Sequence, residues 1–540
     1  MKSEEKDSTL LLSSQSDNIY IFPDAHETHS FLFNVYVNPT KILLFLGGNI
    51  LCLLVAICFL AVYRSAKGGR QNGEEEETEP RKILTPPGGW LRPVSNTEMF
   101  AASAAFLGTG STATVLWLSS LQSIRPEDVK QALSIIAQRI HVLQLCVAWR
   151  WFRPWLRRMK NVVVDFSVDT GDAMSVYYQQ MRTPYNISQG PLWRARLVPQ
   201  PQAAAGSHQA VLVLAIHHVI TDGFTNMIIS RDFMEVLNAI MTGRSYNTPT
   251  RYNIPAITND LLSMRNYIYC FKEVLLTTYK SIARMFIFSH PETKVAFTKV
   301  LYKDFSAETT QELLRHCKEA NVSIHSSIVA AAYLALLRTA QKHLKVKKDS
   351  LSITYDDSVN MRRFFPSIYK DSVGFHVSFC RLEHTVCSSD AESKKNFWKL
   401  ARSIHCGLHH FLDANKAPLL ASPVSWILAV LEQANYVLTR LGYKNAIITN
   451  MTISNMGNLK HLLPGQYGDG PVAISSLLRS VACEFLGCPF LLNFHTLDGR
   501  FSISLDCYIN NVAEDFANNF FSYLTNYVAD ISQCGTISCL

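Results

Sequence analysis

Residues 215–225 read AIHHVITDGFT, and this stretch joins two kinds of hydrophobic pattern. The run VLVLAI at 211–216 is short, continuous and rich in valine and leucine, which is typical of a buried strand. Helical spacing of apolar residues follows over 224–241. His217 and His218 are therefore predicted at the exit of a strand, where sheet proteins commonly display reactive groups.

These residues fit either a catalytic or a structural role. A histidine at such an exit can act as a general base, because its unperturbed pKa is about 6.5. Asp222 can cap the helix or pair with an arginine, and Gly223 allows a close approach of backbone. A histidine that only packs in the core, or lies at the surface, fits the same letters. A shared metal ion is not expected, because adjacent strand residues point to opposite faces.

Helical and strand patterns alternate along the rest of the chain, which indicates an α/β or α+β fold. The apolar stretch at 99–119 is rich in small and hydroxylic residues, and we predict strand and loop there. The stretch at 419–431 is predicted to be a buried or membrane-facing helix, too short to span a bilayer. The other predicted helices are 126–140, 224–241, 307–320 and 324–337, and the predicted strands are 211–216, 352–355, 373–380 and 501–508.

The sequence HHVITDG at 217–223 resembles the HHxxxDG motif of the condensation-domain superfamily of acyltransferases. That superfamily includes chloramphenicol acetyltransferase, peptide-synthetase condensation domains and microbial alcohol acyltransferases, and wax-ester or diacylglycerol synthesis is one form of its chemistry. No DFGWG segment is present, which argues against a plant-type member. Further segments resemble the superfamily in its order: RIHVLQ at 139–144, GPLWRA at 190–195, VSIH at 322–325, VNMR at 359–362 and ISNMG at 453–457.

The resemblance implies an α/β (α+β) fold of two chloramphenicol-acetyltransferase-like lobes, which form a pseudo-dimer around a central channel. His218 would be the general base in mid-channel. Asp222, grouped with it in the catalytic motif, would hold the structure by pairing with Arg362 across the lobe interface. Ser454 or Asn455 would donate a hydrogen bond to the reaction's oxyanion, although the same residues suit a plain turn.

The other two motif residues are given supporting roles. His217 is expected to pack or to form a hydrogen bond, because it faces away from its neighbour on the strand. Gly223 is expected to leave space for neighbouring atoms. Acyl-CoA is the expected co-substrate, since no carrier-protein or adenylation partner accompanies the motif, and no cofactor or metal ion is expected.

Residues 42–63, ILLFLGGNILCLLVAICFLAVY, contain no charged residue. A helix of that length spans the ~30 Å hydrocarbon core of a bilayer, so we predict a single transmembrane anchor. Residues 21–40 hold no Lys or Arg, whereas several cations follow the stretch, which places the body in the cytosol by the positive-inside rule. An endoplasmic-reticulum or other endomembrane location is expected. Three glycosylation sequons, at Asn186, Asn321 and Asn450, would matter only if the body were lumenal.

Composition and pattern divide the chain into five segments. An acidic stretch bounded by glycine and proline follows the apolar segment and reads as a linker. The expected segments are a polar tail (1–41), the membrane helix (42–63), the linker (64–87), lobe one with the HHxxxDG motif (88–290) and lobe two (291–540).

The net charge of +8 is a mild excess of 51 Lys and Arg over 43 Asp and Glu. It forms no concentrated basic stripe of the kind that nucleic-acid binding leaves, so no nucleic-acid partner is expected. Thirteen cysteines without paired spacing favour a reducing compartment. The segment WRWFRPWLRRMK at 149–160 suits a membrane interface, the phosphates of coenzyme A, or a strand and turn with solvated arginines.

The sequence thus predicts a membrane-anchored enzyme that transfers an acyl group from acyl-CoA to a hydroxyl or amine of a lipophilic acceptor. An anchor favours acceptors dissolved in the bilayer. The alternative is a condensation-like module that binds or scaffolds at a membrane without catalysis. Hydrolysis with the same histidine is disfavoured, because no Gly-x-Ser-x-Gly segment is present.

Overall fold

The computed structural model describes residues 89–535, apart from 152, 202–207, 246–279, 281–294, 344–348, 366, 414–423 and 465–469. The apolar stretch at 42–63 and the linker lie outside this range. No single helix in the described part of the chain is long and apolar enough to cross a membrane. One bent pair, Ala307–Glu319 with Ile324–His343, passes that test only when both helices are taken together.

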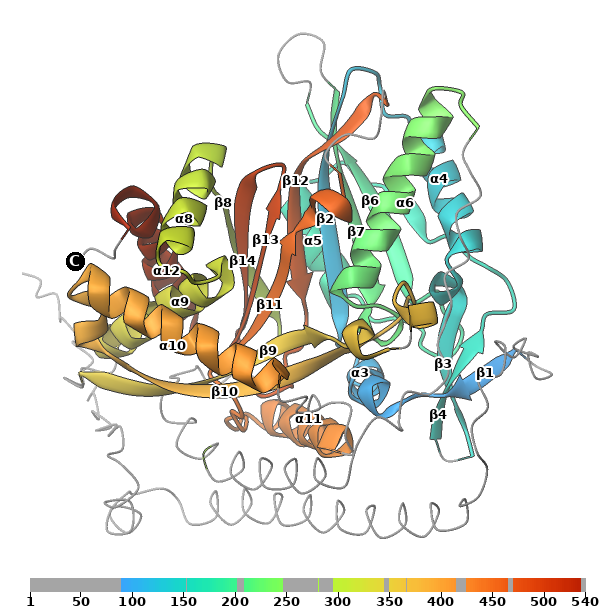
Figure 1. Ribbon diagram of the computed structural model, residues 1–540. Helices are drawn as coiled ribbons and strands as arrows, with labels where there is room; N and C mark the ends of the chain where they lie inside the picture. Colours follow the sequence, from blue (N-terminus) through green and yellow to red (C-terminus); the bar gives the residue numbers. More distant parts are fainter. Residues whose placement is uncertain are drawn as a thin grey trace, which may run out of the picture.

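Helices and strands alternate in the first half of the described chain (Figure 1). The elements are β1 (Trp90–Pro93), α3 (Asn96–Phe106), β2 (Ser111–Ser120), α4 (Pro126–Arg139), β3 (Leu145–Arg150), β4 (Arg153–Arg158), β5 (Phe166–Val168), α5 (Ala173–Arg182), β6 (Trp193–Pro199), β7 (His208–His217) and α6 (Gly223–Met241).

The second half continues the alternation and ends on a long helix. Its elements are β8 (Thr298–Asp304), α8 (Ala307–Glu319), α9 (Ile324–His343), β9 (Ser350–Asn360), β10 (Val377–Cys387), α10 (Lys394–Asp413), α11 (Val424–Arg440), β11 (Met451–Asn458), β12 (Val472–Val481), β13 (Phe490–Leu497), β14 (Arg500–Tyr508) and α12 (Glu514–Cys534).

Two large sheets form the body. The five-stranded sheet has the order β12-β2-β7-β6-β5 and the six-stranded sheet has the order β10-β9-β11-β13-β14-β8. Strand β12 belongs to the second half of the sequence but pairs antiparallel with β2 of the first half. The predicted boundary near residue 290 therefore does not separate the two sheets, since lobe two supplies an edge strand to lobe one.

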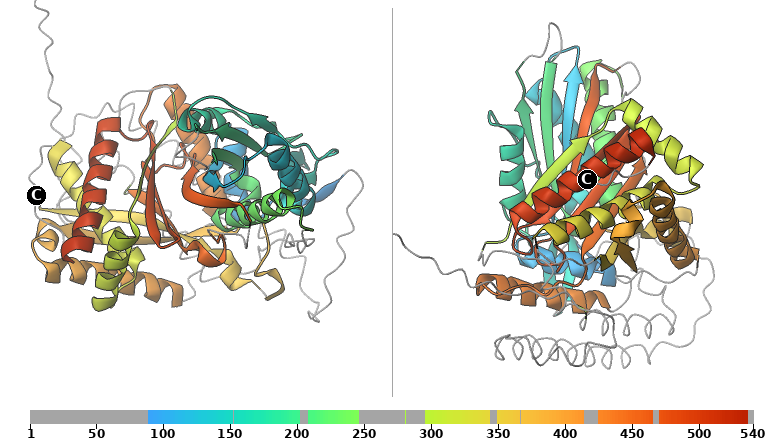
Figure 2. Two further views of the ribbon diagram at one scale, coloured as in Figure 1. Left: turned by 90° about the horizontal axis from the view of Figure 1, so that it is seen from above. Right: turned by 90° about the vertical axis from the view of Figure 1, so that its left-hand side faces the viewer.

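Each sheet is covered by helices with their own core. Helices α4 and α6 pack side by side on the five-stranded sheet, while α8, α9 and α12 cover the six-stranded sheet (Figures 1 and 2). The alanine-rich face of α9 is buried throughout, so small side chains allow close packing on the sheet. The two sheet-and-helix layers match the mixed α/β class that the sequence predicts.

The local patterns located most elements well. Helices α4, α6, α8 and α9 start within one residue of their predicted positions, and buried strand β7 starts three residues before its predicted start. Strand β10 begins at Val377, later than predicted. Of the strand and loop predicted over 99–119, only the part at 99–106 was wrong, because α3 forms there, whereas 107–110 is loop and β2 begins at Ser111. The start of α3 is fixed by a capping box in which the Ser95 side chain accepts from the Glu98 amide and Glu98 accepts from the Ser95 amide.

The segment at 149–160 forms strands β3 and β4 and the turn between them. The side chains of Trp149 and Trp151 are exposed. The guanidinium groups of Arg150 and Arg157 instead lie over the ring of Trp90, 5.4 and 5.3 Å from its centroid. The strand-and-turn interpretation therefore holds, but these arginines stack on an aromatic ring rather than extend into solvent.

Candidate active site

Strand β7 ends at His217, whose ring is fully used inside the protein. Its Nε2 donates to the Thr109 carbonyl at 2.7 Å, and its Nδ1 accepts from the Val219 amide at 3.1 Å. Gly110 has a positive φ of 84° and packs its backbone against this ring, where a Cβ would lie 3.1 Å from His217 Cε1. Burial lowers the pKa of His217 to about 4, so the ring stays neutral. His217 therefore ties the strand end to the loop before β2.

His218 begins the short 3-10 turn His218–Ile220, and within the described part of the chain one nitrogen of its ring has a hydrogen-bond partner. Its Nδ1 lies 2.6 Å from the carbonyl oxygen of Thr221. A carbonyl can only accept, so Nδ1 carries the proton and Nε2 is left as an acceptor. The ring also stands edge-on to Phe375, with 4.9 Å between centroids. Burial lowers the pKa of His218, which favours the neutral form that a general base requires.

A chain of hydrogen bonds holds the Thr221 backbone that orients His218. The Thr221 hydroxyl donates to Asn226 Oδ1 at 2.6 Å, and Asn226 Nδ2 donates to the Thr112 hydroxyl at 3.0 Å. Thr112 in turn donates to the Ile216 carbonyl at 2.9 Å. These hydrogen bonds connect the loop after β7 to α6, α6 to β2, and β2 back to β7. The ring of His218 is therefore positioned by a network anchored on the sheet.

Asp222 does not contact His218 but caps α6 and joins the two halves. Its Oδ1 accepts from the Thr225 amide at 2.8 Å, and its Oδ2 accepts from Arg362 Nη1 at 2.7 Å and from the His376 amide at 2.9 Å. Burial raises the pKa of this carboxyl, but the Arg362 guanidinium outweighs that effect and lowers the pKa to about 2. Both side chains of the pair are 4% exposed. The pairing expected from the resemblance is present, in a structural position.

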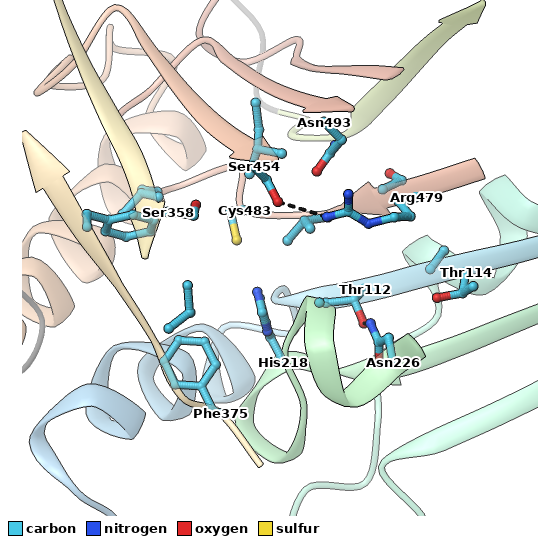
Figure 3. A pocket seen from close by; sticks show the side chains of 18 of the residues that line it. Thr112, Thr114, His218, Asn226, Ser358, Phe375, Ser454, Arg479, Cys483 and Asn493 are labelled. Carbon is cyan, nitrogen blue, oxygen red and sulfur yellow. Dashed lines mark hydrogen bonds between the residues drawn. The ribbon is translucent and has the colours of Figure 1, made fainter. Parts of the chain in front are cut away.

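A cavity of about 60 Å³ lies beside His218, between the two sheets (Figure 3). Its walls come from both halves, as expected of a channel between lobes. The ring of His218 points into this space, facing Ser454 and Arg479 on the opposite side (Figure 3). This volume exceeds what one water molecule requires, so the space beside His218 can admit a reacting group.

Ser454 and Asn455 are separated by the alternation of strand β11. Ser454 lines the cavity and its hydroxyl oxygen accepts from Arg479 Nη2 at 2.8 Å. The Asn455 side chain accepts from the Gly457 amide at 2.7 Å and lies 3.4 Å from His325 Nδ1. Asn455 thus builds a turn outside the cavity lining. Of the two oxyanion candidates, the structure brings only Ser454 to the side of the cavity opposite His218.

Arg479 on β12 was missed by reading the sequence. It lines the cavity, is 6% exposed, and lies close to Gly223, where a Cβ would be 3.5 Å from its Nη2. That distance is an ordinary contact, and the closer neighbour of such a Cβ would be Met456 Sδ at 3.0 Å, so the motif glycine leaves room mainly for Met456. A single cation in the otherwise apolar and small-residue strand VAISSLLRSV was the only local signal. In the described part of the chain, no group of three or more His, Cys, Asp or Glu side chains is arranged to hold a metal ion.

Family models place the chain among known proteins. The model described as alcohol acetyltransferase matches residues 158–493, which is more than half of the chain. The chain belongs to the alcohol acetyltransferase family. The matched residues include the site residues described above, namely His218, Asp222, Arg362, Ser454 and Arg479. The recognition of the condensation-domain superfamily from the HHxxxDG motif is thereby confirmed, and acyl transfer is the class of reaction that the family supports.

Solved structures share the fold of this alcohol acetyltransferase family member. The TRI3 trichothecene 15-O-acetyltransferase of Fusarium sporotrichioides matches with a TM-score of 0.64 and 11% identity, over 83% of this chain and 97% of the other. The first condensation domain of the calcium-dependent antibiotic synthetase matches with a TM-score of 0.58 and 13% identity, over the same shares. At these identities the likeness shows the fold alone.

A curated relative matches over a short stretch. The nonribosomal peptide synthetase dtxS1 of Metarhizium robertsii is 30% identical to this chain over 88 residues. These residues make up 16% of this chain and 1% of the synthetase. The chain thus spans a very small part of that relative's length.

Proposed function

We propose that the protein transfers an acyl group from acyl-CoA to a hydroxyl or amine acceptor, with His218 as the general base. The observation that carries this proposal is the orientation of one ring. Nδ1 of His218 keeps its proton and donates a hydrogen bond to the Thr221 carbonyl. The unprotonated Nε2 is therefore the nitrogen available to the cavity.

The reaction follows from that geometry in two steps. The acceptor O–H or N–H gives its proton to His218 Nε2 while its heteroatom attacks the thioester carbonyl carbon, forming a tetrahedral intermediate. The intermediate collapses, the C–S bond breaks, and the proton on His218 passes to the departing thiolate. No acyl-enzyme is required, because both substrates react side by side in the channel. Asp222 keeps the loop in place through Arg362 and takes no proton.

The membrane placement belongs to the same proposal. The uncharged stretch at 42–63 supports an anchor, and an anchor favours a lipophilic acceptor that reaches the channel from the bilayer. The cations that follow it favour a cytosolic body on an endoplasmic-reticulum or related membrane. Of the three sequons, Asn450 is fully buried, whereas Asn186 and Asn321 are exposed. Glycans on Asn186 or Asn321 in cells would place the body in the lumen.

The test offers the full-length protein acyl-CoAs of several chain lengths with pooled alcohol, sterol and amine acceptors. Thiol release is followed and the products are identified by mass. We expect acceptor-dependent thiol release that His218→Ala lowers by about 10²–10⁴-fold, the range typical of a lost general base. His208→Ala, at the other end of the same strand, is the matched control and retains wild-type turnover.

The product distinguishes the candidate functions. An ester or amide identifies a transferase, and a free acid identifies a hydrolase. No product from folded wild-type protein favours the alternative, a condensation-like module that binds at a membrane. Equal rates for folded wild type and His218→Ala would rule out His218 as the base.

A further inference from the structure

Arg479 is a buried cation without an ion pair. Its side chain is 6% exposed, and no carboxylate lies within salt-bridge distance among the described residues. Its Nη2 donates to Ser454, but its Nη1 has no hydrogen-bond partner in the described part of the chain. Removing a charge from water without a partner costs several kcal/mol, so such a group is retained where it has another use.

Asp506, the acidic group that acts electrostatically on Arg479, has its own hydrogen-bond donors. Asp506 accepts from the Ser480 hydroxyl at 2.5 Å, from the Val481 amide at 2.9 Å and from Asn493 at 2.9 Å. Burial raises the pKa of Asp506 to about 7. Burial also lowers the pKa of Arg479, to about 10, which still leaves the guanidinium charged near neutral pH. The positive charge of Arg479 therefore faces the cavity with little compensation.

The hydroxyl of Ser454 is arranged to act with this cation. Its oxygen accepts the hydrogen bond from Arg479 Nη2, which leaves the hydroxyl proton free to be donated. Ser454 and Arg479 both line the cavity, and Figure 3 places them together on the side opposite the His218 ring. Two donors thus stand across a small cavity from one base.

We propose that Arg479 joins Ser454, a donor that the resemblance already implies, in an anion site for the negative oxygen that develops on the thioester carbonyl. This inference rests on the proposed function. As the acceptor heteroatom attacks and its proton moves to His218 Nε2, the carbonyl oxygen gains a full negative charge. Arg479 Nη1 and the Ser454 hydroxyl donate to that oxygen, and they release it when the C–S bond breaks and the carbonyl re-forms. A fixed charge in a water-poor cavity stabilises such an oxygen strongly.

The position of Arg479 favours this ligand over a carboxylate of the substrate. Arg479 and His218 line the same cavity, so an oxygen held by Arg479 lies in the space where His218 would act. A substrate carboxylate bound there would take the place of the reacting carbonyl. The two ligands share one chemistry, and the experiment separates them by the acyl-CoA that is used.

The first experiment compares turnover of Arg479→Met, Arg479→Lys and Ser454→Ala in the full-length protein. Loss of one such donor typically lowers kcat by about 10²–10³-fold, and we expect that for Arg479→Met with every acyl-CoA. Arg479→Lys keeps the charge and recovers part of the rate, and Ser454→Ala loses less than Arg479→Met. The control is Arg381→Met, which removes a largely buried arginine that pairs with Asp356 at 2.6 Å. It should lower the melting temperature without changing the kcat of folded protein.

A second readout excludes a merely structural role. Because Arg479 is charged, buried and unpaired, Arg479→Met should keep or raise the melting temperature, whereas a structural arginine would lower it. Wild-type turnover in folded Arg479→Met would overturn the proposal. So would a loss confined to malonyl- or succinyl-CoA with acetyl-CoA unaffected, since that result assigns Arg479 to a substrate carboxylate.

A third measurement separates this proposal from the proposed function. Acetate, titrated at constant ionic strength, should raise the melting temperature of wild type and of His218→Ala but not of Arg479→Met. If wild type transfers no acyl group and acetate still stabilises it through Arg479, the anion site stands and the transferase proposal fails. If wild type is inactive and acetate has no effect that depends on Arg479, the anion site is overturned as well.

Discussion

His217 and His218 are neighbours in sequence, yet their environments are opposite. Both ring nitrogens of His217 have partners within the loop and strand, while among the described residues only Nδ1 of His218 has one. His217 is 2% exposed, and the His218 ring points into the cavity. The comparison shows that the two histidines of the motif have different roles. One ring builds the loop, and the other is held by that loop with its basic nitrogen free for chemistry.

The largest expected effect comes from exchanging each ring for glutamine. His218→Gln should lower kcat by about 10²–10⁴-fold and leave the melting temperature nearly unchanged, because the base is lost and few contacts are. His217→Gln should do the reverse. It should retain much of the kcat but unfold at a lower denaturant concentration. A buried donor or acceptor that loses its partner lowers the free energy of unfolding by about 1–3 kcal/mol. Similar kinetic losses in both folded variants would break the comparison.

A smaller effect on the rate, with a large one on stability, is expected at Asp222. Asp222→Ala leaves the Arg362 guanidinium buried without its carboxylate and removes the cap of α6. We expect a loss of about 3–5 kcal/mol of unfolding free energy, measured by urea denaturation. Asp222→Asn keeps a cap acceptor and should lose less. If Asp222→Ala instead abolished turnover without any loss of stability, Asp222 would act in the chemistry alongside His218.

The smallest effect is a separation of two pH dependences. Protonation of His218 stops its action as a base, and its lowered pKa means that turnover falls only below pH 6.5. His217 has a folded pKa of about 4 against 6.5 in the unfolded chain. The unfolded state therefore binds more protons, and the stability from this group is lost as pH falls from 6.5 to about 4. His217→Gln should flatten the fall in stability over that range and leave the pH profile of turnover in place.

The sequence predicted the place of His218 at a strand exit and the cap at Asp222, because both depend on local order, whereas the role of His218 as a base came from the resemblance and stays a prediction. A strand run, two histidines, a cap and a helix follow one another within about thirty residues. The pairing of Asp222 with Arg362, 140 positions away, came from the resemblance alone. Ser454 could not be told from Asn455, because the choice depends on which face of β11 meets the cavity.

Arg479 could not be predicted for a different reason. Its place opposite His218 depends on β12 crossing from the second half of the chain to pair with β2. No pattern within residues 472–481 reports that crossover. Helix α3 was missed because it is buried on all sides and shows no amphipathic period, so its alanines and the capping box at Ser95 carried the helix signal.

The crossover of β12 also sets the order in which the protein can be completed during synthesis. Strand β2 ends at Ser120, but its partner β12 starts only at Val472. While the ribosome makes the intervening chain, one edge of the first sheet stays open to other strands, a condition that invites misassembly. The same late strand carries Arg479. The nascent chain therefore closes that edge and acquires the cation of its cavity in a single event.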